Sequence, residues 1–192
     1  MSGLRKILMR SDVAPILRRF FTNTLFDSTF MLLGIVIGSS SAPGLGVNVV
    51  IVTMITSSLA LGISSGVSIY EAESLERERS ISELERALFR DLKGTEIERS
   101  AKLIPLLTAL INFFTPLISC GVTILPFLLV GLRVLDMSVA FWSSVVLAFA
   151  LLFSGGVYIG RVGRKNPVIK GLRMLIFGLI AFFIGLMLQS LV

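Results

Sequence analysis

One carboxylate and one thioether lie in the first long apolar run of the chain, where they could bind a metal ion together. Asp27 is the only acidic residue inside any apolar run, and Met31 follows it by four residues, which puts both on one face of a helix. A carboxylate in hydrocarbon costs about 3 kcal/mol, so it should face the bundle interior, a water cavity or a bound cation. With the soft thioether it would suit Fe²⁺ better than Mg²⁺ or Ca²⁺. The alternatives are an Asp27 hydrogen-bonded to Thr24 or Ser28 near the interface, and a Met31 that only packs.

Three neutral polar side chains in later apolar runs could add oxygens to a partly dehydrated ion. They are Ser64, Ser65 and Asn112. Ser and Asn in membrane helices also hydrogen-bond neighbouring helices and so hold a bundle together. The residue types are compatible with an ion pathway and with this structural role, and the sequence leaves both open.

Acidic residues are concentrated in one polar segment, because nine of the twelve lie between residues 71 and 101. Glu73 and Glu76 are about one helical turn apart and nearest the membrane, and Glu83 follows Glu76 by seven residues on the same face. Clustered carboxylates bind Mn²⁺, Fe²⁺, Mg²⁺ or Ca²⁺ without strong discrimination. Neighbouring arginines partly neutralise them, so we expect weak attraction of cations. The alternative is a solvated helix whose charges pair with one another.

The composition is that of a membrane protein, with 54% apolar and 16% charged residues in a chain of 192. The net charge of +6 comes from Lys and Arg beside hydrophobic runs, which membrane topology explains better than nucleic-acid binding. The absence of His and the single Cys120 exclude the usual zinc and copper sites and a disulfide framework. No nucleophile has a visible base, so we expect neither an enzyme nor a permanently bound cofactor.

The elements that must position these residues form one all-α membrane domain over residues 1–192. A basic segment at residues 1–19 is expected to lie on the bilayer surface, and residues 71–101 to form a cytosolic helical extension of the second span. No Pro or Gly interrupts that extension before Gly94, and Thr95 and Glu98 form a capping box for the next helix. Five spans are expected, at about residues 20–40, 47–70, 103–132, 137–160 and 168–191.

The run from Leu103 to Leu132 is too long for one straight span and too short for two. If it crosses once, 17 of the 18 Lys and Arg lie on one side of the membrane and only Arg133 lies on the other. Because basic residues accumulate on the cytosolic side, one crossing is preferred. This places the N-terminus in the cytosol and the C-terminus outside it, in a multi-pass protein of the cell membrane if the source is prokaryotic.

Small residues form smooth faces on several spans. Gly34 and Gly38 are a GxxxG pair, against which a second-span face made by Ser58, Gly62 and Gly66 could pack. The fifth span carries glycines seven apart on one face: Gly171, Gly178 and Gly185. These faces suit tight packing within the chain or across a dimer, and five short helices can scarcely bury all of them, so we expect a homodimer in the lipid bilayer.

Three stretches together resemble the vacuolar iron transporter (VIT) family over about residues 24–190. They are FDSTFMLLGIVIGSSS, LALGISSGVSIYEAESLERE and GRVGRKNPVIKGLRMLIFGLIAFFIGLML. The last is similar to that family's Gly-Arg-x-x-Gly-Arg-Asn-Pro turn and the entry to its final helix. The resemblance implies a homodimer with a metal pathway between protomers, cytosolic acidic groups that gather divalent ions, and exchange of metal for protons.

The chain departs from the family pattern in its second span. Where the family usually reads Met-Gly-x-Gly-Glu-Tyr, this sequence has a Leu at 61 and a Ser at 65, so one thioether and one carboxylate are missing. The extension at residues 71–101 is also shorter than the family's metal-binding insert. The expected function is a transporter that exchanges Fe²⁺ or Mn²⁺ for protons out of the cytosol. The alternative is a non-transporting scaffold or lipid-interacting protein of the same fold.

Overall fold

The computed structural model describes residues 13–40, 44 and 46–190, and helices are the only regular structure within them. The elements are α2 (Val13–Ser40), α3 (Val47–Leu88), α4 (Glu96–Thr123), α5 (Leu125–Gly131), α6 (Met137–Val162) and α7 (Pro167–Gln189). Five of these helices, all except α5, are long and apolar enough to cross a membrane. The predicted all-α, five-span architecture is therefore confirmed.

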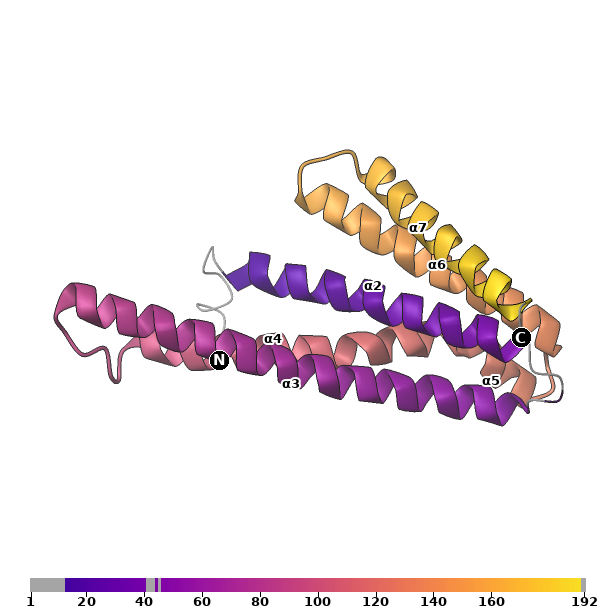
Figure 1. Ribbon diagram of the computed structural model, residues 1–192, viewed down its shortest axis with the longest axis horizontal. Coiled ribbons are helices and arrows are strands. Elements are labelled where there is room, and N and C mark those ends of the chain that lie inside the picture. The colour runs from indigo at the N-terminus through magenta and orange to yellow at the C-terminus, as the bar shows by residue number, and fades with distance from the viewer. Residues whose placement is uncertain (1–12, 41–43, 45, 191–192) are drawn as a thin grey trace.

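The helices form a bundle whose two sides differ (Figure 1). Helix α4 lies against α2 and α3, and the α6–α7 hairpin packs on the side of α2 away from α3. The start of α2, the α3–α4 turn and the α6–α7 turn lie towards one end of the bundle, and α5 lies at the other. Most of the expected basic segment, residues 1–12, lies outside the described residues. The remainder belongs to α2, so residues 13–19 continue directly into the first span.

Helix α3 continues from the membrane span into the acidic segment as one helix of 42 residues, as predicted. At 1.5 Å per residue it is about 63 Å long, roughly twice the ~30 Å hydrocarbon thickness, so its second half projects beyond the bundle. It ends at Leu88, earlier than the stop expected at Gly94, because Phe89 adopts the left-handed conformation with φ 48° and donates its N–H to the Glu85 carbonyl. Gly94, with φ 75°, lies in the turn that returns to α4.

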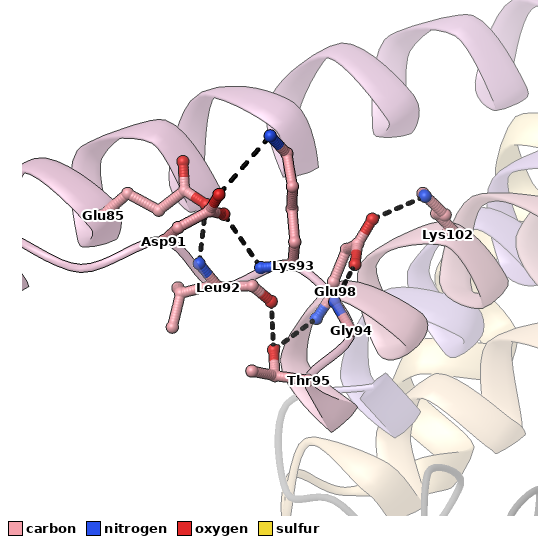
Figure 2. A network of polar contacts seen from close by, with 8 residues as sticks. All are labelled: Glu85, Asp91, Leu92, Lys93, Gly94, Thr95, Glu98 and Lys102. Carbon is pink, nitrogen blue, oxygen red and sulfur yellow. Dashed lines mark hydrogen bonds and ion pairs between the residues drawn. The ribbon is translucent and has the colours of Figure 1, made fainter.

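The turn from α3 into α4 is held by a network of polar contacts (Figure 2). Thr95 caps α4, since its Oγ1 accepts the backbone N–H of Glu98 at 3.4 Å, which confirms the predicted cap. The Glu98 carboxylate in return accepts the backbone N–H of Gly94 at 2.7 Å, one residue before the position expected for a capping box. It also accepts a hydrogen bond from Lys102 Nζ at 2.6 Å. The Lys102 hydrogen bond and then the Gly94 N–H hold the pKa of Glu98 below its ordinary value.

The long apolar run after residue 102 crosses the bundle once, as the distribution of charges predicted. Helix α4 contains Pro105 and Pro116, and it stops at Thr123 before the seven-residue helix α5. Pro126 lies in the first turn of α5, where a missing N–H removes no helical hydrogen bond. The excess length of the run is therefore taken up by the short helix α5, which packs on α6 and α3.

The small residues of α3 pack on α4, and the expectation that they meet Gly34 and Gly38 is wrong. A Cβ added to Gly62 would lie 2.6 Å from the Phe113 carbonyl oxygen, and one added to Gly66 would lie 3.3 Å from that of Ala109. Backbone of α4 thus occupies the space that a side chain at Gly62 would need, so this close approach requires glycine there, and the contact at Gly66 is tight. Gly34 and Gly38 have no atom within 4 Å of an added Cβ.

The glycine row of α7 packs against other helices of the same protomer, with Gly171 and Gly178 buried and Gly185 half-buried. A Cβ on Gly171 would lie 2.7 Å from the Phe153 ring, and one on Gly178 would lie 2.6 Å from Leu152 Cδ1, both on α6. Gly185 faces Ile37 of α2, at 3.0 Å from an added Cβ. Of the two roles expected for these glycines, the structure shows packing within the chain.

Candidate metal pathway

Asp27 is exposed on the surface of the protomer, in the middle of a helix that can span the membrane. Within the described residues its carboxylate makes no hydrogen bond or ion pair. The local partners considered for it are engaged elsewhere: Thr24 hydrogen-bonds to the Asn112 side chain, and Ser28 Oγ donates to Leu25 O at 3.0 Å and to Ser119 Oγ at 2.9 Å. The structure therefore does not show the alternative in which Asp27 hydrogen-bonds to Thr24 or Ser28.

Asp27 belongs to a stripe of exposed residues along α2, which we call the α2 stripe: Asn23, Asp27, Gly34 and Gly38. The spacings of 4, 7 and 4 residues place these positions within about 40° of Asp27 around the helix. The predicted partner Met31 lies at the border of the stripe and is half-buried, in contact with the hydrophobic core. The stripe therefore places the Asp27 carboxylate near the Met31 thioether and includes two glycines, Gly34 and Gly38, beside which no other atom of the described residues packs.

Ser64 and Ser65 are adjacent in sequence but face different surroundings. Ser64 is exposed on the outer side of α3. Ser65 is half-buried against α4, and its Oγ lies 3.4 Å from the Asn112 carbonyl oxygen and 3.3 Å from that of Gly62. Pro116 has no N–H to offer the Asn112 carbonyl four residues earlier, so the Ser65 hydroxyl supplies the missing donor. Ser65 thus links α3 to α4.

Asn112 is completely buried and links α4 to α2. Its side-chain oxygen accepts a hydrogen bond from Thr24 Oγ1, and its Nδ2 donates to the Thr108 carbonyl at 2.8 Å. Buried amides need such partners, because an unpaired polar group in this environment is costly. In the protomer the amide of Asn112 therefore faces the interior, whereas Asp27 faces outwards.

Sequence reasoning missed the larger polar row to which Asn112 belongs. Five buried polar residues follow one face of α4: Thr108, Asn112, Thr115, Ser119 and Thr123. The row contacts α2 through Ser28 and contacts α6 through Ser144, whose Oγ donates to the Thr123 carbonyl at 2.8 Å. The signal was present in the sequence as a spacing of 4, 3, 4 and 4 residues, which keeps all five on one helical face.

The three carboxylates expected to attract cations are not gathered in the structure. Glu73 is only 8% exposed, and its Oε2 lies 3.8 Å from Arg77 Nε. Glu76 and Glu83 are exposed on the extension. Across the residues that the structure describes, no three acidic, His or Cys side chains are placed to hold a metal ion together.

A polar cleft of about 530 Å³ lies between the extension of α3 and the start of α4. Its charged lining contains as many cations as carboxylates: Arg77, Lys93 and Lys102 face Glu78, Glu85 and Glu98. Lys102 is bonded to Glu98, and Lys93 Nζ lies 3.4 Å from Asp91 Oδ2 beside the cleft (Figure 2). Balanced charge of this kind favours weak cation attraction over a tight site.

Comparison with known proteins is consistent with this architecture. An uncharacterized protein of Methanocaldococcus jannaschii is 27% identical over 159 residues, which is 81% of this chain and 80% of that protein. No solved structure matches the chain. The model of the VIT family matches residues 84–189, which cover α4 to α7 and more than half of the sequence. The predicted resemblance is confirmed, and the chain belongs to the VIT family.

Proposed function

We propose that this protein transports Fe²⁺ or Mn²⁺ across the membrane in exchange for protons, as a homodimer whose ion pathway runs between the protomers. The observation that carries the proposal is the position of Asp27, a carboxylate exposed on the protomer surface within a membrane span. Membership of the VIT family supports divalent metal transport as the class of activity.

An exposed carboxylate within the bilayer needs a partner other than lipid, because hydrocarbon offers it neither hydrogen bonds nor counter-charge. A second copy of the chain that packs on the α2 stripe would remove Asp27 from lipid. Gly34 and Gly38 favour this contact, since their open backbone lets another helix approach closely. The proposal therefore treats the α2 stripe as the dimer interface.

Two-fold symmetry would bring the same surface of both protomers together. An interface centred on the α2 stripe would then carry two Asp27 carboxylates and, at its border, two Met31 thioethers. The carboxylates suit both Mn²⁺ and Fe²⁺, and the softer thioethers favour Fe²⁺ over Mg²⁺ or Ca²⁺. Ser64, also exposed, could contribute oxygen, while Ser65 and Asn112 would support the pathway walls through the contacts between α3, α4 and α2.

Proton exchange follows from the chemistry of the same carboxylate. A carboxylate can hold either a metal ion or a proton, so binding of one favours release of the other. Asp27 is the only acidic residue in the apolar stretches of the five spans, so it is the group that both ions would share. The protein would act as a transporter without catalysis, without a permanently bound cofactor and without nucleic acid as a partner.

The proposed orientation places the extension of α3 in the cytosol. The basic residues of the α2 start, the α3–α4 turn and the α6–α7 turn would then all be cytosolic, and Arg133 would lie outside. Glu73, Glu76 and Glu83 would raise the local concentration of cations near the pathway, and transport would run out of the cytosol through the cell membrane of a prokaryote.

A non-transporting scaffold or lipid-interacting protein is the second candidate. The observation that favours it is Ser65, which stands where the family pattern has a carboxylate and whose hydroxyl serves the contact with α4. Leu61 likewise stands where that pattern has a thioether. Both changes remove possible metal ligands from α3 and leave the bundle intact.

The test is flux of Mn²⁺ and Fe²⁺ into proteoliposomes under a pH gradient. We expect Asp27→Asn to abolish flux, because it keeps the shape of the side chain but removes the charge that binds metal and proton. The melting temperature of the variant should stay the same or rise, because the substitution removes a charged group from a surface that lies within the hydrocarbon core of the bilayer. Asp136→Asn, the same change at the start of α6 outside the apolar stretch, is the matched control and should transport normally.

Two results would contradict the proposal. Normal flux through Asp27→Asn would show that another group couples metal to protons. If the wild-type protein moves neither ion with or without a pH gradient, the scaffold is the better description.

A further inference from the structure

We propose a binding site for one anionic phospholipid in a groove between α2, α4 and α6, with an acyl chain in the groove and the phosphate at Arg18. The groove has a volume of about 480 Å³. It is distinct from the α2 stripe, and the proposal does not depend on metal transport.

The walls of the groove are mostly apolar and come from three helices. Leu17 and Phe21 of α2 face Leu110, Phe114 and Ile118 of α4, and Tyr158 of α6 completes the lining. The three α4 side chains are about half exposed in the protomer. Since α2, α4 and α6 span the membrane, lipid acyl chains are the molecules that can occupy this apolar groove.

The length of the groove confines it to one leaflet. Leu110 and Ile118 are eight residues apart, which is about 12 Å along α4, or less than half of the ~30 Å hydrocarbon thickness. Arg18 lies in the second turn of α2, on the end of the bundle from which the α3 extension projects. The groove therefore begins near the membrane surface at Arg18 and runs towards the bilayer centre at Ile118.

Arg18 supplies the charge that selects an anionic headgroup. Its Nε donates to the Ala14 carbonyl at 3.0 Å, which fixes the position of the guanidinium. This hydrogen bond does not use the two terminal amino groups, so they can donate to a ligand. Within the described part of the chain, no carboxylate forms an ion pair with Arg18. A guanidinium that has no counter-ion among the described residues, at the end of an apolar groove, is complementary to a lipid phosphate, which it can bind through two parallel hydrogen bonds.

Two neighbouring features favour this occupant. Tyr158 lies in the lining with its ring edge-on to Phe21, at 6.4 Å between centroids, so an amphipathic side chain stands at the level of the headgroups. Arg161 follows Tyr158 by three residues, one turn nearer the membrane surface, and adds positive charge on the α6 side. The site would therefore hold α6 against α2 and α4 when it is filled.

The experiment measures lipid retention and lipid-induced stabilisation of the full-length protein in detergent. Dioleoyl phosphatidylglycerol and dioleoyl phosphatidylcholine share acyl chains and differ in net charge, so native mass spectrometry with each isolates the headgroup contribution. We expect phosphatidylglycerol to bind more tightly to the wild type, and Arg18→Gln to weaken it about fivefold, the usual effect of one basic residue near an anionic headgroup. Arg18→Lys should retain part of the preference.

The matched control is Arg19→Gln. Arg19 is adjacent and exposed, stacks on Phe20 at 4.9 Å, and does not line the groove. It should leave phosphatidylglycerol binding nearly unchanged. Leu110→Trp fills the groove at an exposed position and should weaken retention of both lipids, while an unchanged melting temperature without lipid verifies its fold.

Several outcomes would overturn the site. Equal retention of the two lipids by the wild type would show that Arg18 does not select an anionic headgroup. Equal losses of phosphatidylglycerol binding in Arg18→Gln and Arg19→Gln would indicate that diffuse surface charge attracts the lipid. Full retention by Leu110→Trp would show that no chain occupies the groove. Displacement of phosphatidylglycerol by millimolar inorganic phosphate would indicate a site for free phosphate in place of a lipid.

Discussion

The hydroxyl of Ser65 on α3 lies 3.4 Å from the backbone carbonyl of Asn112 on α4, the carbonyl that Pro116 leaves without a helical donor. This contact joins two helices that also meet through Gly62, where an added Cβ would lie 2.6 Å from the Phe113 carbonyl oxygen, and through Gly66, where the approach is less close. A proline in a span is tolerated when a neighbouring helix satisfies the freed carbonyl. Ser65 therefore links α3 to α4 through a hydrogen bond, whereas its neighbour Ser64 is exposed and does not.

Replacing Ser65 should lower stability more than replacing Ser64. Ser65→Ala removes the hydroxyl donor to the Asn112 carbonyl, which we expect to cost about 0.6 kcal/mol, the average for interhelical hydrogen bonds in a membrane protein. Ser64→Ala removes the same hydroxyl from an exposed position and should change stability less. Reversible unfolding in mixed micelles measures both. Equal effects would show that the Ser65 contact does not stabilise the α3–α4 pair.

Leucines in the α2 stripe should disrupt the proposed dimer without unfolding the protomer. Gly34→Leu with Gly38→Leu adds side chains where the protomer has open space, so the monomer should fold and its mass by light scattering in detergent should fall to that of one chain. Gly178→Leu is the contrasting variant, because an added Cβ there already lies 2.6 Å from Leu152 Cδ1. It should lower the melting temperature instead. An unchanged dimer mass in the α2 variant would rule out this stripe as the interface.

The orientation of the chain can be tested by cysteine labelling in a Cys120→Ala background. Phe89 lies in the α3–α4 turn and is 97% exposed, and Val134 lies in the turn before α6 and is 67% exposed. If the charge distribution sets the topology, Val134→Cys should react with an impermeant maleimide on intact cells. Phe89→Cys should react only after permeabilisation. The opposite pattern would invert the proposed orientation and with it the direction assigned to transport.

The contribution of Glu98 to stability should depend on pH. Lys102 and the Gly94 N–H lower the pKa of Glu98 in the folded state below its ordinary value of about 4.5. Because the folded pKa is the lower one, this stabilisation is present above the ordinary value and is lost as the pH falls through the folded pKa. Glu98→Gln should therefore melt below the wild type at pH 7, and the difference should disappear on acidification.

Lys102→Met is the companion variant for the pH measurement. It removes the largest cause of the low pKa of Glu98 and keeps the Gly94 contact, so the loss of stability should begin at a higher pH. Identical melting of wild type and Glu98→Gln at pH 7 would show that the charge of Glu98 in the turn of Figure 2 contributes nothing measurable to stability.

The sequence alone was sufficient for the architecture. Long apolar runs must form helices in a bilayer because every backbone group has to be satisfied internally, and the one-sided distribution of Lys and Arg selected five spans over six. The uninterrupted run into the acidic segment predicted that α3 continues beyond the membrane, although α3 ends at Leu88 and not at the expected Gly94. Thr95 with Glu98 predicted the start of α4. The apolar runs and the cap are local signals, and the charge distribution needs only the order of residues along the chain, so none of them requires knowledge of which helices pack together.

The sequence did not show which faces meet. A small-residue row looks the same whether it packs inside a protomer, as Gly178 does, or stays open, as Gly34 does. The hydroxyl row of α4 could be recognised by its spacing, but its partners on α2 and α6 lie more than 20 residues away in the chain. Periodicity identifies a face, and only the relative rotation of packed helices determines the partner of that face.

The candidate site divides in the same way. The sequence by itself identified Asp27 as the intramembrane carboxylate, because its charge within an apolar run is costly wherever the helix lies. Only the tertiary structure decided that Asp27 faces outwards while Thr24 and Ser28 face α4. It also decided that the Ser65 hydroxyl donates to the carbonyl that Pro116 leaves without a helical donor. The burial of Glu73 beside Arg77 likewise depends on helix packing. The physical reason is that residue type sets the energetic cost of a group, whereas helix packing decides which neighbour offsets that cost.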